Sequence, residues 1–454
     1  MLDAIVVGGG ISGTVAADRL RAAGRSVVLL EARDRLGGRT CTVDLLGHAV
    51  DVGGQWIGPT QKRAHALARR LGIATYEQHH RGAKVVRLGA HTATYRGLLP
   101  RTAWNGGTAD DPRIGPRQLL SLGRALAHIE LAALRLPVGD PWDARNAAKH
   151  DALSVEEWLV RNVGDPVARR VLSWGVNAVF ACEPRDLSVL YLLHYARSAG
   201  GFQPLLEIRG GAQQTKLHGG TQQYAKRLGE GLDVRLEWPV RAIVQDERGV
   251  TVRGERGELR AGRVILAVPP PLAHAIDFAV PLPAGRAAMH AKMPMGSALK
   301  WIVAYRTPFW RERGLSGEAV GDGRFVRAAF DACAPDGSFH ALVGFVFGDD
   351  LADLKERDET GRRDAIVEDL VSFFGPEARD AIGYVDRDWT SEPWSAGCYV
   401  GVAPPGLLTE VGAALRAPAG RVHFAGTETA TRWTGYFDGA IEAGERAAAE
   451  VLGG

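Results

Sequence analysis

The sequence has little cysteine and no strong excess of either charge. Its 454 residues include only four cysteines, which have neither CxxC spacing nor neighbouring histidine clusters: Cys41, Cys182, Cys333 and Cys398. We therefore expect a reduced compartment and no metal site. The formal net charge is only +3, without a long basic run, so we expect no nucleic-acid partner.

The sequence also lacks any apolar run near the roughly eighteen residues that a membrane helix needs. Its first residues already read as a strand, which leaves no room for a signal peptide, and no hydrophobic tail precedes Gly454. We expect no membrane anchor and a cytoplasmic location. P-loop, GxSxG and HExxH motifs are missing, which excludes the nucleotide-hydrolysing, serine-hydrolase and zinc-protease sites that they mark.

The N-terminus contains a dinucleotide-binding turn. A β-rich run over Asp3–Val7 leads into Gly8–Gly13, which is followed by a helical Thr14–Ala23 and a second buried strand, Ser26–Leu30, that ends in Glu31. Strand, GxGxxG, helix, strand and acid in this order, within about thirty residues, predict a Rossmann-type nucleotide site.

Each part of this turn has a physical task. Gly8 permits the tight turn, Gly10 lets the backbone approach a pyrophosphate, and Gly13 lets helix and strand pack closely. Free N–H groups at the helix N-terminus favour phosphate, and Glu31 can accept hydrogen bonds from ribose hydroxyls. A glycine-rich turn without a ligand is the alternative interpretation.

The segments after this turn bear on the choice between NAD and FAD. Arg33–Arg39 reads Arg-Asp-Arg-Leu-Gly-Gly-Arg, and Asp51–Gln61 follows, with a helix predicted between Pro59 and Gly72. A Gly-Gly-Arg after the acid is similar to that of flavoproteins of the glutathione-reductase-like and amine-oxidase-like classes. There it presents backbone and a guanidinium to phosphate and flavin, which favours FAD.

Further ordered motifs stand downstream: Gly296–Lys300, Ser395–Tyr399, Phe424–Thr429 and Trp433–Tyr436. Together with the N-terminal motifs, they resemble the flavin-containing amine oxidase family, specifically its monoamine oxidase branch. The resemblance covers most of the chain. It is poorest between about residues 81 and 199, where substrate pockets in this family differ.

The resemblance implies an α/β fold with an FAD-binding, Rossmann-like domain of the glutathione-reductase type and a second, α+β substrate domain. The FAD-binding domain would combine residues 1–80, 205–290 and 390–454. The substrate domain would combine 81–204 and 291–389, with a mostly helical insertion at 81–204. A length of 454 residues suits two domains.

Local patterns agree with this division, because helix signals gather in the insertion and short strands follow it up to a run of three prolines. The helix signals are the capping box Ser154–Glu157, the Asp165-Pro166 start, and the stretches Arg117–Leu136 and Asp186–Arg197. The strands are Val234–Leu236, Val240–Asp246, Val250–Arg253 and Val264–Val268, before Pro269–Pro271.

Three residues are the catalytic candidates that the resemblance implies. Lys300 stands in the apolar, strand-like Ala298–Tyr305, where a lysine is costly without a partner or a wet cavity. In the family this lysine holds a water against flavin N5, supporting amine oxidation and the reaction with oxygen; a lysine reaching the surface is the alternative. Tyr399 and Tyr436 would face each other before the flavin and orient the amine, with plain packing as the alternative.

Cys398 directly precedes the first of these tyrosines. The resemblance implies a bond from its sulfur to the flavin 8α-methyl, as in membrane-bound monoamine oxidases. Many relatives without a membrane anchor have another residue there and hold FAD non-covalently. A free thiol beside the ring is therefore the alternative.

The remaining cofactor and substrate residues are implied by the same resemblance. The FAD cradle would include Gly8, Gly10, Gly13, Glu31, Arg33, Gly38, Arg39, Gly54, Gln55, Trp56, Val240, Trp394, Cys398, Gly426, Thr427, Glu428 and Phe437. The substrate pocket would include Tyr195, Leu206, Gln213 and Phe330, with Trp433 packed nearby. A polyamine substrate would favour acidic pocket residues, for which Asp331 is one candidate.

The implied activity is FAD-dependent oxidation of a small amine to an imine, which hydrolyses to an aldehyde or ketone, with O2 reduced to H2O2. Arylalkylamines are the default substrates, and a homodimer is expected from the family. An amino-acid oxidase would want an arginine where Gln55–Gly58 stands, and a desaturase would lack Lys300 and the tyrosine pair. A polyamine oxidase, a specialised biosynthetic amine or amide oxidase, and a flavoprotein without turnover remain as alternatives.

Overall fold

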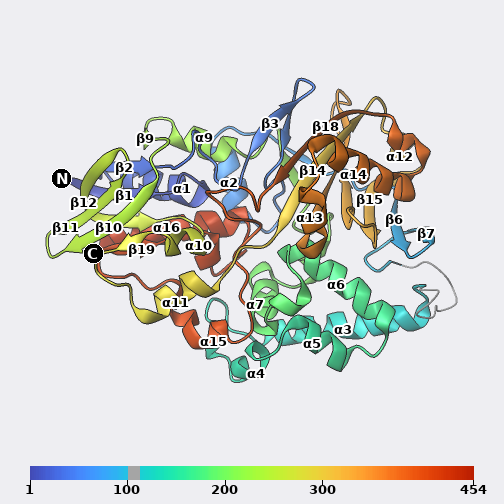
Figure 1. Ribbon diagram of the computed structural model, residues 1–454, viewed down its shortest axis with the longest axis horizontal. Coiled ribbons are helices and arrows are strands. Elements are labelled where there is room, and N and C mark those ends of the chain that lie inside the picture. Colours follow the sequence, from blue (N-terminus) through green and yellow to red (C-terminus); the bar gives the residue numbers. More distant parts are fainter. Residues whose placement is uncertain (101–112, 454) are drawn as a thin grey trace.

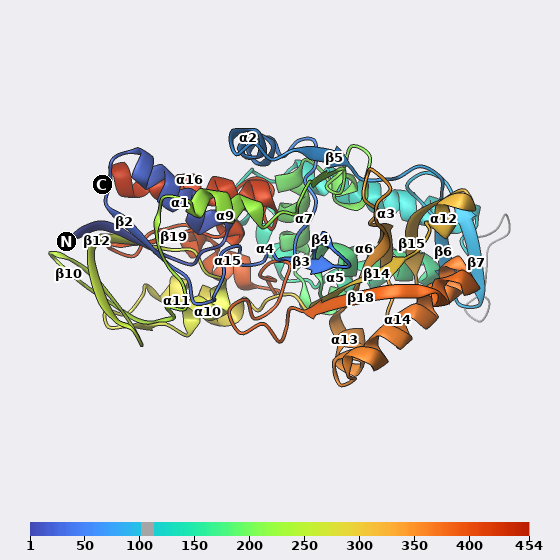
Figure 2. The same cartoon turned by 90° about the horizontal axis from the view of Figure 1, so that it is seen from above.

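The computed structural model describes residues 1–100 and 113–453. Residues 101–112, within the predicted 81–204 insertion, and Gly454 lie outside the described part. The molecule is elongated, with one β-sheet toward each end and a group of helices beside the second sheet (Figure 1). Both ends of the drawn chain lie at the end that holds the first sheet (Figures 1 and 2).

The first sheet has eight strands in the order β13-β10-β11-β12-β1-β2-β9, with β19 paired to β12. β1 runs parallel to β12 and β2, whereas β10, β11 and β12 form an antiparallel meander. Ala4 to Val7 of β1 are buried, as expected for a parallel strand covered on both faces. The strands are β1 (Leu2–Val7), β2 (Val27–Leu30), β9 (Asp233–Arg235), β10 (Val240–Asp246), β11 (Gly249–Gly254), β12 (Gly257–Leu266), β13 (Asp277–Phe278) and β19 (Val422–Phe424).

Helices from the N-terminal, central and C-terminal parts of the chain lie around this sheet. They are α1 (Ile11–Ala22), α2 (Lys62–Arg70), α9 (Gln223–Gly229), α10 (Pro270–His274), α11 (Ala284–Lys292), α15 (Leu407–Val411) and α16 (Phe437–Gly453). α1 and α16 lie side by side, so closely that a Cβ on Gly444 would come 2.3 Å from the carbonyl oxygen of Ser12. This packing brings the last helix against the glycine turn at the start of the chain.

The second sheet has seven strands in the order β18-β14-β17-β16-β15-β6-β7. They are β6 (Ala83–Leu88), β7 (His91–Tyr95), β14 (Ala298–Tyr305), β15 (Leu315–Gly321), β16 (Ala328–Asp331), β17 (His340–Phe347) and β18 (Ala381–Asp388). All pairings are antiparallel except that of β15 with β6. Two further two-stranded sheets are formed by β3 (Thr42–Leu45) with β4 (His48–Asp51) and by β5 (Thr75–Glu77) with β8 (Thr215–Leu217).

The two faces of β14 meet different surroundings, and this fixes the direction of Lys300. Leu299, Trp301 and Val303 pack into a core with Ile366 and Leu370 of α14 (Glu359–Phe374). α12 (Phe309–Glu312) and α13 (Gly348–Lys355) are the other helices of this part of the chain. Because side chains alternate along a strand, Lys300 points to the opposite face of the sheet.

A helical layer covers that opposite face (Figure 1). It contains α3 (Pro116–Leu134), α4 (Ala147–Asp151), α5 (Val155–Asn162), α6 (Pro166–Phe180), α7 (Val189–Ala199) and α8 (Gln203–Leu206). The predicted capping box is present, because Ser154 Oγ accepts the Glu157 N–H at 3.1 Å and Glu157 accepts the Ser154 N–H at 3.0 Å. Asp165 starts α6 by accepting two backbone N–H groups at 3.0 Å.

The predicted α/β class is confirmed, with three local differences. The mostly helical insertion also contains β6 and β7, which extend the second sheet. The helix expected over Asp186–Arg197 starts only at Val189, because Ser188 Oγ caps it by accepting the Tyr191 N–H at 3.0 Å. The proline run does not merely end a strand; it begins α10, where prolines at the first positions need no N–H partner.

Two further features are missing from the described residues. Within residues 1–100 and 113–453, no helix combines the length and the apolar character that crossing a bilayer requires. In the same ranges, no group of three or more His, Cys, Asp or Glu side chains is arranged to hold a metal ion.

Candidate active site

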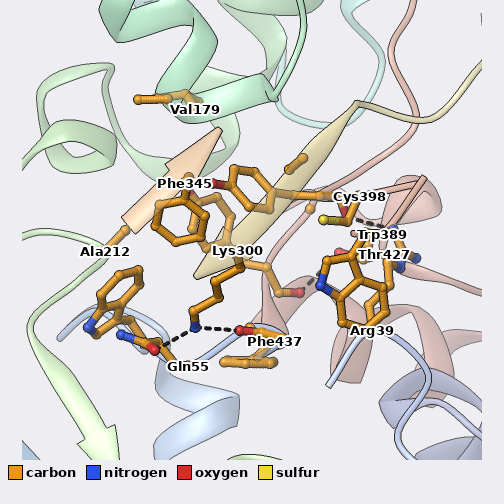
Figure 3. A pocket seen from close by; sticks show the side chains of 18 of the residues that line it. Arg39, Gln55, Val179, Ala212, Lys300, Phe345, Trp389, Cys398, Thr427 and Phe437 are labelled. Atoms are coloured by element: carbon orange, nitrogen blue, oxygen red, sulfur yellow. Dashed lines mark hydrogen bonds between the residues drawn. The ribbon is translucent and has the colours of Figure 1, made fainter. Parts of the chain in front are cut away.

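A cavity of about 400 Å³ begins at the glycine turn after β1. It extends along the face of the second sheet that carries Lys300. Segments far apart in the sequence line it, including Gly53–Trp56, α6, α7 and strands β14 to β17. Figure 3 shows part of this lining around Lys300. Of the residues predicted for the site, all except Gly13 and Glu428 line this cavity.

The glycine turn closes one end of the cavity. A Cβ on Gly13 would come 1.9 Å from the Gly8 carbonyl oxygen, so Gly13 serves the packing of turn and helix, not the cavity wall. A Cβ on Gly10 would meet nothing nearer than 3.9 Å, so the space above its backbone is open. Gly10 precedes α1 without a side-chain cap, and the first turn has no acidic residue. The helix N-terminus is therefore suited to an anion.

Glu31 and Arg33 connect this turn to the C-terminal motif. Glu31 accepts the Gly9 N–H at 2.7 Å and the Arg33 N–H at 2.9 Å. The Arg33 guanidinium is buried, donates to Ser395 Oγ at 2.8 Å and lies 3.3 Å from Glu392. These contacts hold the end of β2 against the loop that carries Cys398 and Tyr399.

Glu428 lies behind the cavity wall and orients Arg39. Arg39 donates to the two Glu428 carboxylate oxygens at 2.6 and 3.1 Å and to the Tyr399 carbonyl oxygen at 2.8 Å. Burial alone would raise the pKa of Glu428, but Arg39 and backbone N–H groups outweigh it, so the pKa lies below its ordinary value. Glu428 does not line the cavity but holds Arg39, which does, and its place in the FAD cradle stays a prediction.

Lys300 extends into the cavity with two partners. Its Nζ donates to the Gly53 carbonyl oxygen at 2.8 Å and to Gln55 Oε1 at 2.5 Å (Figure 3). The side chain is only 2% exposed, so the alternative of a lysine reaching the surface does not hold. Burial lowers the pKa of Lys300 to about 7, although the nearby Asp51 carboxylate opposes this shift. At neutral pH the amine is therefore present in both forms.

The two predicted tyrosines belong to different aromatic groups on the cavity wall. Tyr399 meets Phe345 of β17 edge-on, with ring centroids 5.7 Å apart. Tyr436 meets Trp433 edge-on at 5.0 Å and Tyr195 of α7 at 5.8 Å. Each ring is thus fixed by its own neighbours, and both remain in contact with the cavity.

Cys398 is a buried free thiol that lines the cavity beside Arg39 and Lys300. Burial raises the pKa of its thiol to about 12, and the two cations only partly offset this shift. In this environment the sulfur is a protonated thiol, not an activated thiolate. The peptide bond between Cys398 and Tyr399 is cis.

The predicted substrate residues Tyr195, Leu206, Gln213 and Phe330 all line the cavity. Gln213 Nε2 donates to the Leu205 carbonyl oxygen at 3.1 Å, and in the described part of the chain its Oε1 has no hydrogen-bond partner. The acidic candidate Asp331 does not belong to the lining.

Asp331 is instead part of a buried ion pair. Arg311 donates to both of its carboxylate oxygens at 2.7 Å, and Trp310 donates to one of them at 2.9 Å. The carboxylate therefore has no free oxygen for a polyamine, which overturns that suggestion. Its neighbour Phe330 has the opposite side-chain direction on β16, as alternation along a strand requires.

Several lining residues were missed by sequence reasoning. Phe345 and Phe347 lie on one face of β17 with stacked rings 5.7 Å apart, and their two-residue spacing is the signal that could have found them. Trp389 lines the cavity and donates to the Val52 carbonyl oxygen at 2.9 Å. Glu318 of β15 also lines it, and a glutamate inside an apolar strand could have been noticed by the reasoning applied to Lys300.

The donors present at this site fit FAD. The open backbone at Gly10 and the N-terminus of α1 suit a pyrophosphate. At the other end, Gln55 Nε2 is buried and has no hydrogen-bond partner among the described residues, and Phe437, the first residue of α16, lines the cavity. A buried amide donor and a second helix N-terminus suit the polar edge of a flavin ring.

Comparison with known proteins gives extensive matches. The family model described as flavin containing amine oxidoreductase matches residues 11–452. The Mycobacterium tuberculosis protein provisionally named flavin-containing monoamine oxidase AofH is 40% identical over 454 residues, covering 99% of this chain and 96% of that protein. Flavin-containing amine oxidase B of Homo sapiens is 36% identical over 457 residues, covering 99% of this chain and 86% of that protein.

Solved structures match over the whole chain as well. Wild-type putrescine oxidase bound to putrescine has a TM-score of 0.93 and 32% identity, covering 100% of this chain and 99% of that chain. Cyclohexylamine oxidase from Brevibacterium oxydans has a TM-score of 0.92 and 32% identity, with the same coverage. Since the family match spans nearly the entire sequence, the predicted relationship is confirmed, and the chain belongs to the family of flavin-containing amine oxidoreductases.

Proposed function

We propose that this enzyme uses FAD to oxidise a small amine to an imine, which hydrolyses to an aldehyde or ketone, while O2 is reduced to H2O2. The observation that supports this most is the buried Lys300, which reaches the same cavity as the glycine turn and the two tyrosines. FAD, when bound, accepts a hydride equivalent from the α-carbon of the amine and passes the electrons to oxygen.

The protein would hold the cofactor with groups from three segments. The backbone at Gly10 and the N-terminus of α1 would bind the pyrophosphate, Glu31 the ribose and Val240 the adenine. Arg39, oriented by Glu428, would keep the C-terminal loop against the flavin end of the cavity.

The substrate amine would lie between Tyr399 and Tyr436. The wall around them is largely apolar or aromatic, with Leu206 and Phe330 among its residues. Desolvation in such a cavity disfavours the ammonium form, so the reacting amine is held neutral, with its lone pair available. Lys300 would hold a water near the reacting atoms and supply positive charge for the reaction with oxygen.

We also propose that Cys398 is bonded to the flavin 8α-methyl carbon. The bond would form with loss of the thiol proton and one methyl hydrogen, a two-electron oxidation in which O2 is reduced to H2O2. The sulfur lines the cavity, and Arg39 and Lys300 nearby favour its deprotonation during the reaction.

Denaturation tests this bond. Wild-type protein precipitated with acid should retain its yellow colour in the pellet, whereas Cys398→Ala protein should release all of its FAD to the supernatant. Intact-mass spectrometry of the wild type should show the added mass of one FAD. Release of all flavin from the wild type would contradict the proposal and leave Cys398 as a free thiol.

An amino-acid substrate is disfavoured by the partners of the cavity arginines. Among the described residues, the arginines that line the cavity are Arg33, Arg39 and Arg327. They are paired with Glu392, Glu428 and Asp350, respectively. A substrate carboxylate would have to displace one of these carboxylates, which costs free energy.

The two-domain division remains a proposal. The strands of the first sheet fall within 1–80, 205–290 and 390–454, and those of the second within 81–204 and 291–389, which supports it. A homodimer and a cytoplasmic location stay predictions from the sequence.

An oxygen-electrode assay with a coupled peroxide readout tests the activity. A panel of arylalkylamines, alkylamines, diamines and amino acids should include amines that give one H2O2 per O2 consumed, together with an aldehyde or ketone. Amino acids should be inactive. Turnover of amino acids alone would contradict the proposed substrate class.

A further inference from the structure

A charged group lies toward one edge of the second sheet, where the proposed chemistry does not use it. Lys84 of β6 lies 3.0 Å from Glu318 of β15 and 3.3 Å from Glu207, which follows α8. All three line the same cavity as Lys300. We call these three residues the distal cluster.

The strand register places the distal cluster far from Lys300 on one face of the sheet. Lys300 pairs with Phe345, which pairs with Ala328, and Ala328 pairs with Val320 of β15. Directly paired residues share a face, and Glu318, two residues before Val320, shares it too. Three strand spacings separate β14 from β15, which amounts to about 14 Å between their backbones.

Glu318 has an unused hydrogen-bond acceptor. The residue is 6% exposed, its Oε2 faces Lys84, and its Oε1 has no hydrogen-bond partner within residues 1–100 and 113–453. A buried carboxylate oxygen without a partner is costly, because it has lost water and gained nothing in return. Since Glu318 lines the cavity, a ligand that brings an N–H donor or a cation to Oε1 would offset this cost.

The charges of the distal cluster are also unbalanced. Two carboxylates share one ammonium, because Lys84 contacts both Glu207 and Glu318. Burial lowers the pKa of Lys84, but the two carboxylates outweigh it and raise the pKa above its ordinary value, so this lysine stays charged. Arg327, which also lines the cavity, is paired with Asp350 at 2.7 Å. Burial raises the pKa of Glu318 above its ordinary value, although Lys84 opposes this shift, so a cationic ligand group beside Oε1 would favour the ionised carboxylate.

We propose that the preferred substrate is an amine that carries a second cationic group at the far end of an apolar chain. One amine would lie between Tyr399 and Tyr436, and the second would bind Glu318 Oε1. The helical wall of the cavity is apolar, with Leu122, Leu126, Val171, Leu172 and Trp174 facing the chain of such a substrate. This inference rests on the proposed function and narrows its substrate class to diamines and related long amines.

The test compares octylamine with the straight-chain diamine of the same length, using steady-state kinetics of the flavin-loaded enzyme. In the wild type, kcat/KM should be about tenfold higher for the diamine. Glu318→Gln removes the charge but keeps the size, and should lower this ratio about tenfold. The substitution should raise KM for the diamine and leave kcat nearly unchanged, since Glu318 lies far from the reacting carbon.

Two further variants test whether the distal cluster recognises the diamine or only stabilises the fold. Lys84→Met leaves the two carboxylates without their cation, so the preference for the diamine should rise. Glu258→Gln removes an exposed glutamate paired with Arg253 on the first sheet, and should leave the ratio as in the wild type. Thermal unfolding of each variant shows whether it is folded.

The outcomes separate a failure of substrate selection by the distal cluster from a failure of the proposed amine oxidation. If octylamine is oxidised but the diamine is not preferred, the distal cluster does not select substrate, and the proposed function stands. If Glu318→Gln and Lys84→Met change both substrates equally, the cluster is structural and the inference is wrong. If no amine of any class reduces the flavin, the proposed function itself fails.

Discussion

A Gly10→Val protein should fold but purify without flavin. Gly10 has φ −74° and ψ 179°, an extended conformation that valine adopts readily, and a Cβ there meets no atom within 3.9 Å. The added side chain would instead occupy the space in which the pyrophosphate must approach the backbone. We expect FAD affinity to fall by at least about 100-fold, or roughly 2.7 kcal/mol.

Two matched variants make this result specific. Gly13→Val should fail to fold, because its Cβ would lie 1.9 Å from the Gly8 carbonyl oxygen, a clash within the protein itself. Gly164→Val, at an exposed position where an added Cβ would meet no atom within 4 Å, should bind FAD normally. The readouts are flavin absorbance per protein and circular dichroism. A yellow Gly10→Val protein with full FAD content would contradict the assigned binding site.

Lys300→Met should separate the two halves of the catalytic cycle. Reduction of O2 builds negative charge, and Lys300 in its protonated form is a buried cation with partners that hold it in place. Loss of one such charged donor is expected to slow the reaction with oxygen by about 100-fold. Reduction of the flavin by amine without oxygen should slow by less than about tenfold, because one lost hydrogen bond to a water costs about 1 kcal/mol.

Stopped-flow absorbance measures both steps on the same preparation. Lys292→Met is the control, because Lys292 is an exposed lysine paired with Glu410 on the surface. It should leave both rates as in the wild type. Equal slowing of both steps by Lys300→Met would contradict the oxygen-specific role, and no slowing of either would remove Lys300 from the mechanism.

Lys300 also predicts a dependence of stability on pH. Burial lowers its folded pKa from 10.5 to about 7. Between these values the unfolded chain binds more protons than the folded protein, so the free energy of unfolding rises with pH. From about pH 7 to about pH 9.5, the wild type should gain on the order of 3 kcal/mol relative to Lys300→Met, measured by chemical denaturation.

Much of the fold could be read from local chemistry. Ser154 and Asp165 predict helix starts because their side chains satisfy backbone N–H groups within three residues, and both starts are present. The glycine turn is equally local. By contrast, β6 and β7 join a sheet whose other strands come more than two hundred residues later, so no local pattern could show their pairing.

The site residues also differ in whether a local sequence pattern reveals them. Lys300 stands out in the sequence because a lysine in an apolar strand is costly unless it has a partner. In the structure it lines the cavity and has two partners. Asp331 looked like a free carboxylate only because its partner Arg311 lies on another element. The separation of Glu318 from Lys300 follows only from the strand register, which the sequence does not show. Pairing between distant segments is what sequence reasoning lacked.

Anaerobic reduction of the flavin tests the central claim most directly. The purified protein would be mixed with arylalkylamines, alkylamines and diamines in the absence of oxygen, and flavin absorbance followed. We predict that the yellow colour bleaches with at least one amine and returns, with release of peroxide, when air is readmitted. A flavin-loaded protein that no amine bleaches would contradict the assignment of amine oxidation to this cavity.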